Sequence, residues 1–109
     1  MSQNVDELLD ALRRDEPADL SIERSPRTTE VKVGVETIAR IDERNEELVV
    51  YVPADTRARL EAQYPEARPD PSGLGFDLRD RGQNATGLRL LRSRARVQRV
   101  GWQYRERSP

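Results

Sequence analysis

The spacing of apolar residues near the amino end predicts a helix with one buried face. Apolar side chains in residues 4–14 recur at the i, i+3, i+4, i+7 spacing of such a helix, namely Val5, Leu8, Leu9 and Leu12. Asn4 with Glu7 three positions later is a variant of the capping box, and Pro17 marks the expected end. We therefore expect an amphipathic helix that packs against the rest of the chain.

Alternation of apolar and polar residues then predicts three strands. The segments are residues 30–33, 37–42 and 47–52, which read "EVKV", "TIARID" and "ELVVYV". Gly34 separates the first two, and the polar residues "ERNE" separate the last two, as in a chain of hairpins. Residues 21–29, interrupted by Pro26, are expected to be a connector. The pattern thus predicts a three-stranded antiparallel meander.

The second half of the chain has shorter and weaker patterns. Residues 54–64 predict a helix capped by Asp55 or Thr56 and ended by Pro65. A proline-rich loop over residues 65–73, a strand within "GFDLRD" (75–80), a loop over 81–87 and a strand over 88–91 follow.

The segment over residues 94–106 fits both periods. At period two, Val100, Trp102 and Tyr104 share one face of a strand. At the helical period Ser93 caps a helix whose buried stripe consists of Val97, Val100 and Tyr104. Gly101 lowers the helix propensity, so local preference favours the strand slightly.

Composition limits the kinds of function that the chain can have. The chain of 109 residues has room for a single small α+β domain over residues 1–109, with only 35% hydrophobic and 36% charged residues. It has no cysteine and no histidine, which excludes thiol chemistry and the commonest general base and metal ligand. We expect a non-enzymatic protein without a cofactor or a metal.

Two further patterns support this expectation. The carboxylate pairs Asp42–Glu43 and Glu46–Glu47 flank a predicted turn, where solvated charges are commoner than catalytic pairs. No apolar run is long enough to span a membrane, and the first ten residues are polar and acidic. We therefore expect a cytoplasmic protein.

The order of these segments carries a family resemblance. The strings "TEVKV", "TIARI", "LVVYVP" and "ADTRARLEAQY", followed by an "ARP" loop, lie between Thr29 and Asp80. This half of the chain resembles the YjbR/MmcQ-like family of small domains. The resemblance implies a closing carboxy-terminal helix, which "SRARVQRVGWQYRE" could supply, and we expect that helix with a strand as the alternative. The family is described as a DNA-binding "double wing" fold from its architecture, so the resemblance also implies a nucleic-acid role without identifying site residues.

Charge is distributed unevenly along the chain. Residues 1–55 have a net charge of −7 and residues 56–109 of +6, although the total is only −1. From Arg79 onward the net charge is +7. Such asymmetry indicates a polyanionic partner, since arginines placed on phosphates release condensed counterions. On a final helix, Arg92, Arg96 and Arg99 would form one ridge that Arg89 extends, with Trp102 exposed for base stacking.

Three alternatives remain open at the level of sequence. The excess of 18 arginines over a single lysine reflects either codon usage or a selected preference for the guanidinium fork. The acidic and basic halves could neutralise each other, with Trp102 packed in the core. The same basic ridge, or the acidic half, could also dock on an oppositely charged protein surface, which would make the protein an adaptor, regulator or inhibitor.

Overall fold

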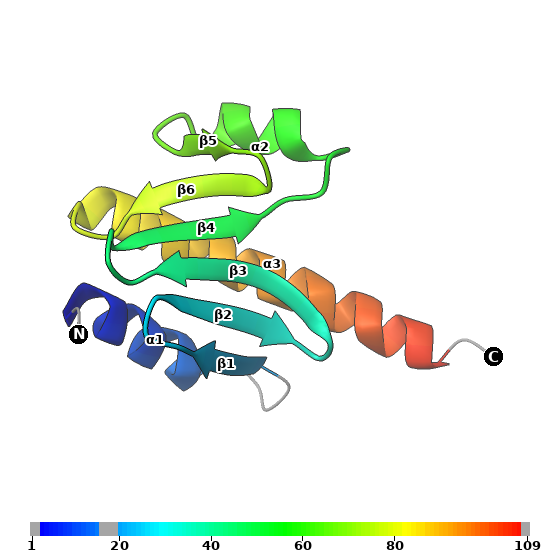
Figure 1. Ribbon diagram of the computed structural model, residues 1–109. Helices are drawn as coiled ribbons and strands as arrows, with labels where there is room; N and C mark the ends of the chain where they lie inside the picture. The colour runs from blue at the N-terminus through cyan, green and yellow to red at the C-terminus, as the bar shows by residue number, and fades with distance from the viewer. Residues whose placement is uncertain (1–2, 16–19, 108–109) are drawn as a thin grey trace.

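The protein is an antiparallel sheet with helices packed on one side (Figure 1). The computed structural model describes the backbone of residues 3–15 and 20–107 and the side chains of residues 3–14 and 20–97. The elements are α1 (Gln3–Asp15), β1 (Leu20–Arg24), β2 (Thr28–Val33), β3 (Glu36–Asp42), β4 (Glu47–Tyr51), α2 (Arg57–Gln63), β5 (Arg68–Asp70), β6 (Gly73–Asp77) and α3 (Arg81–Arg107). The sheet order is β1-β2-β3-β4-β6-β5, and all neighbours are antiparallel. The predicted α+β class is confirmed.

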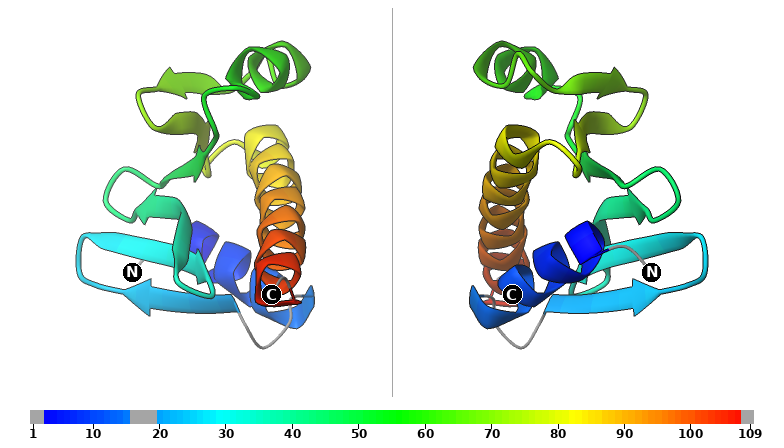
Figure 2. Two further views of the ribbon diagram at one scale, coloured as in Figure 1. Left: turned by 90° about the vertical axis from the view of Figure 1, so that its right-hand side faces the viewer. Right: turned by 90° about the vertical axis from the view of Figure 1, so that its left-hand side faces the viewer.

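The core lies between the sheet and the helices α1 and α3 (Figure 2). Alternate residues of each strand point toward these helices, so that one face of the sheet is apolar. The opposite face carries charged residues, and no helix covers it within the described ranges. The largest fully buried side chains of the core include Phe76, Leu8, Leu9, Leu12, Ile41, Leu48, Leu74 and Leu91.

Six of the predicted elements are confirmed with shifts of their ends, among them the strand predicted within residues 75–80, which is β6. The predicted helix over 4–14 is α1, and its four stripe residues are all buried. Asn4 lies inside α1 and donates a hydrogen bond to Glu46 Oε1 (3.1 Å). The three meander strands are β2, β3 and β4. The helix predicted over 54–64 is α2, where Thr56 precedes the first turn without a side-chain capping bond. Pro17 lies outside the described residues.

The two edge strands were not predicted. Residues 21–29, expected to be a connector, contain most of β1 and the start of β2. All five residues of β1 pair with β2, and its half-buried Leu20 and Ile22 alternate with exposed residues. The proline-rich loop contains β5, which pairs with β6. Pro69 is tolerated there because an edge strand needs hydrogen bonds on one side only.

The loop predicted over 81–87 and the strand predicted over 88–91 are wrong, because both segments belong to α3. Asp80 Oδ1 accepts a hydrogen bond from the backbone N–H of Gln83 (3.1 Å), which caps the helix at its start. Ser93, the alternative cap, is therefore in the middle of the helix. The buried face of α3 is formed by small and apolar residues at helical spacing: Gly87, Leu90, Leu91 and Ala95.

The ambiguous segment over 94–106 is helical, as the resemblance implied. Helix α3 has 27 residues, which corresponds to a length of about 40 Å. Figure 1 shows its carboxy-terminal part extending past the end of the sheet. A single helix thus joins the core of the domain to a projecting basic end.

Candidate nucleic-acid interface

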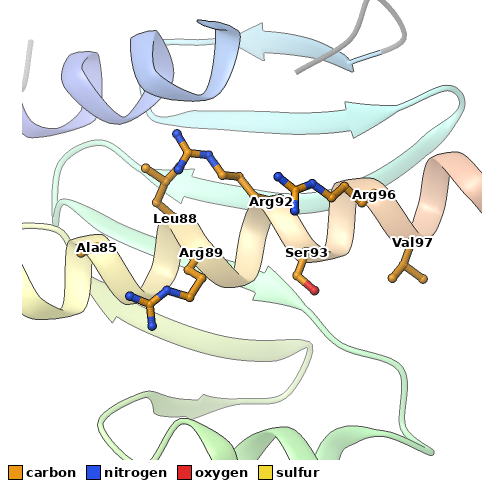
Figure 3. A pocket seen from close by; sticks show the side chains of 7 residues that line it. All are labelled: Ala85, Leu88, Arg89, Arg92, Ser93, Arg96 and Val97. Carbon is orange, nitrogen blue, oxygen red and sulfur yellow. The ribbon is translucent and has the colours of Figure 1, made fainter. Parts of the chain in front are cut away.

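The predicted arginine ridge lies along a groove on α3. The groove has a volume of about 690 Å³, and all of its lining residues come from this one helix. They are Ala85, Leu88, Arg89, Arg92, Ser93, Arg96 and Val97 (Figure 3). Three of the five predicted site residues, Arg89, Arg92 and Arg96, are therefore brought together on successive turns.

The opposite side of α3 holds this face in position. Leu90, Leu91 and Ala95 are buried against the sheet, which turns the groove residues away from it. A β-carbon built on Gly87 would lie 3.0 Å from Phe76 Cγ and 3.1 Å from Leu48 Cδ2. The absence of a side chain at Gly87 thus allows the helix to approach β4 and β6 closely.

The three arginines differ in their surroundings. Arg89 and Arg96 are exposed, and neither forms an ion pair in the described part of the chain. Arg92 is half-buried and extends toward α1, where its Nη2 donates to the carbonyl oxygen of Ala11 at 3.5 Å (Figure 3). Arg92 therefore differs from the two exposed arginines of the ridge.

The remaining two site residues lie farther along α3. Arg99 and Trp102 belong to the helix, but their side chains lie outside the described residues. The same holds for Val100 and Tyr104 of the predicted buried stripe. Val97, the first residue of that stripe, is 58% exposed and lines the groove. The prediction for Val97 is wrong, because the face that includes Leu91 and Ala95 determines which side of the helix is buried.

Several acidic residues of the amino-terminal half pair with bases of the same half. Arg24 pairs with Asp6 (2.8 Å) and Glu43 (2.5 Å), and Lys32 pairs with Glu23 (3.2 Å). Residues 81–105 contain seven arginines and no acidic residue. Where the structure describes side chains, Arg89 and Arg96 form no ion pair with the acidic half. At Arg89 and Arg96, mutual neutralisation by described residues is therefore not observed.

The turn carboxylates have structural roles. Asp42 accepts hydrogen bonds from the backbone N–H groups of Arg44 and Asn45, and the Asn45 bond is the main cause of the lowered pKa of Asp42. The pKa of Glu43 is lowered chiefly by its hydrogen bond from Arg24. Glu47 forms a pair with Arg68. These contacts stabilise a turn and a sheet face.

The open face of the sheet carries a second set of satisfied charges. Arg40 Nη2 lies 3.2 Å from Asp70 Oδ1, and its guanidinium lies 5.7 Å from the ring centroid of Tyr51. The pKa of Asp70 is lowered, mainly because Ser72 donates a hydrogen bond to it. Paired charges leave this face less attractive to a polyanion than the groove.

Arg94 was not among the predicted site residues. Its side chain is half-buried, and burial lowers its pKa although Asp55 exerts an opposing attraction. Arg94 follows Arg92 by two residues, a rotation of about 200° around the helix, which places it on the other side of α3. The sequence could have indicated this only through the apolar face that Leu90 and Leu91 define.

The described residues contain no group of three or more potential metal ligands. None of the helices, so far as they are described, has the length and apolar character needed to cross a membrane. Comparison with family models, curated proteins and solved structures found no match for this chain.

Proposed function

We propose that the protein binds nucleic acid through the arginine face of α3, with contacts to the phosphate backbone and without reading the base sequence. The observation that supports this most directly is the exposure of Arg89 and Arg96 without ion pairs to any described residue, on a helix that has no acidic residue from position 81 to 105. Each guanidinium that contacts a phosphate releases condensed counterions, which favours binding regardless of sequence. The resemblance to the YjbR/MmcQ-like family favours the same function.

The charge of the remaining chain restricts how nucleic acid can approach. Residues 1–78 have a net charge of −8, whereas the chain from Arg79 onward has +7. A polyanion is repelled by the net charge of residues 1–78 and attracted by that of α3, so the encounter is oriented before contact. The projecting end of the helix in Figure 1 provides room for a bulky partner beside the domain.

Binding of a fluorescently labelled DNA duplex, followed by anisotropy over a range of salt concentrations, tests the proposal. If Arg89, Arg92, Arg96 and Arg99 each contact one phosphate, the logarithm of the affinity falls with the logarithm of salt with a slope of about −3.6. The double variant Arg89→Gln/Arg96→Gln should reduce this slope by about 1.8 and weaken binding equally for unrelated sequences.

A matched control removes the same charge elsewhere. Arg27 and Arg59 are exposed and lie outside α3, so Arg27→Gln/Arg59→Gln should leave the slope unchanged. Equal losses in both double variants, or no binding at low ionic strength by the folded protein, would contradict the proposal. Because Trp102 is the only tryptophan, quenching of its emission by single-stranded DNA tests base stacking separately.

A second candidate function is the docking of an acidic protein segment in the same groove. It is favoured by the exposure of Val97 and by the half-buried Leu88 beside the arginines. Apolar surface of this kind suits an amphipathic helix more than a phosphate backbone. Val97→Ser distinguishes the two functions, because it should lower the affinity for a protein partner and leave the affinity for DNA unchanged.

A further inference from the structure

A second cavity lies at one end of the sheet, where β3 begins and β4 ends. These two antiparallel strands are neighbours, and α3 crosses the sheet behind them (Figure 1). The cavity has a volume of about 290 Å³ and is lined in part by Glu36, Ile38, Val52, Pro53 and Arg94. It shares no lining residue with the groove on α3. A ligand in it would therefore contact none of the groove residues.

The positive charge in this cavity is incompletely satisfied. Arg94 Nε is inaccessible to solvent and has no hydrogen-bond acceptor among the described residues. Asp55 attracts the guanidinium electrostatically, but the two side chains do not form an ion pair. Arg94 as a whole is only half-buried and lines the cavity, so a bound anionic group would meet its other guanidinium N–H groups. A carboxylate is suited to this role because it accepts two parallel hydrogen bonds from a guanidinium.

A negative charge lines the same cavity. Glu36 is exposed at the first position of β3 and forms no ion pair within the described part of the chain, with Arg94 or with any other base. The buried Ile38 and the half-buried Val52 supply apolar surface to the same cavity. Two opposite charges that line a small, partly apolar cavity without contacting each other match a ligand that is itself dipolar.

We propose that this cavity binds a small zwitterion of the α-amino acid class. Its carboxylate would accept hydrogen bonds from Arg94, its ammonium group would pair with Glu36, and an aliphatic side chain would contact Ile38 and Val52. Such pairing replaces water at both ends of the ligand and satisfies the guanidinium.

The test compares three probes that share one aliphatic skeleton. L-leucine carries both charges, isocaproate lacks the ammonium group and isoamylamine lacks the carboxylate. In amide chemical-shift titrations of the full chain, L-leucine should shift the signals at the start of β3 and around Val52. It should bind about tenfold or more tightly than either other probe, as expected for loss of a charged hydrogen-bonding group.

Two variants separate the contributions of the charges. Arg94→Gln should abolish binding of L-leucine and isocaproate, and because it removes a desolvated charge it should leave the protein folded. Glu36→Gln should lower the affinity for L-leucine about tenfold, and the affinity for isocaproate should stay the same or rise. Arg96→Gln, on the opposite side of α3, is the matched control and should not change L-leucine binding.

Several results would overturn the proposal. One is the absence of localised shifts with L-leucine at millimolar concentration. Another is that glycine binds as tightly as L-leucine, which would show that the aliphatic side chain of the ligand makes no favourable contact. A third is a coupling between Arg94→Gln and Glu36→Gln in unfolding free energy without ligand, since this would show that the two side chains pair with each other in solution.

Discussion

Gly87 offers a direct test of how α3 is held on the sheet. Alanine normally stabilises the interior of a helix by about 0.8–1 kcal/mol relative to glycine. At Gly87, however, the added carbon would lie 3.0 Å from Phe76 Cγ and 3.1 Å from Leu48 Cδ2, whereas carbon atoms pack best at about 3.5–4.0 Å. Both neighbours are fully buried, so neither can move into solvent.

Overpacking of this kind costs about 1–3 kcal/mol, so the net effect of Gly87→Ala is a destabilisation of about 0–2 kcal/mol. Gly82→Ala is the matched control, because the new carbon there meets only Asp80 Oδ1 at 3.3 Å in an exposed turn. The free energies of unfolding of the two variants should differ by about 1–3 kcal/mol, which separates their melting temperatures by at least about 4 °C. Urea unfolding and thermal melts measure this difference. Equal or higher stability of Gly87→Ala relative to Gly82→Ala would refute the close approach of α3.

Three further predictions concern the body of the domain. Glu43 has a lowered pKa in the folded protein because Arg24 donates hydrogen bonds to it. Ionised Glu43 therefore stabilises the fold at a pH above its ordinary pKa of about 4.3. This contribution is lost as the pH falls through the lower pKa of the folded state. In Glu43→Gln, the free energy of unfolding measured with urea should therefore fall less steeply as the pH is lowered. An equally steep fall in the variant and the unsubstituted protein would contradict this. Phe76→Ala, at a fully buried site, should cost about 3–5 kcal/mol in the same assay, and a cost below about 1 kcal/mol would exclude its central place in the core. Arg68→Ala should cost less than about 1 kcal/mol, because the 59% exposed Arg68 side chain pairs with Glu47 at the surface; a larger loss would reveal an additional role.

The elements that could be predicted are those with a strong period. The stripe of α1 and the alternation in β2, β3 and β4 each repeat over several residues, so local sequence was sufficient. The edge strands β1 and β5 are short and contain or adjoin proline, which hides their alternation. Their pairing depends on a neighbouring strand that is already in place.

The start of α3 could have been found by one signal. Asp80 followed by Gln83 is a capping pattern, and the hydrogen bond between them confirms the cap. Asn84 and Gly87 concealed the helix because both have low helix propensity. Tertiary packing overrides that preference: Asn84 donates a hydrogen bond to the Leu78 carbonyl oxygen, and Gly87 fits against Phe76.

The amino-acid sequence alone determined that positive charge would be concentrated after Arg79 and that histidine and cysteine chemistry would be absent. It also determined the amphipathic first helix and the central meander, because these depend on contacts close in sequence. Only the tertiary structure decided which arginines of α3 face outward. The rotation of a helix is set by the residues that pack best on the sheet, here Leu90, Leu91 and Ala95, and those partners are distant in sequence. The same rotation exposes Arg89 and Arg96 and turns Arg94 toward a second cavity.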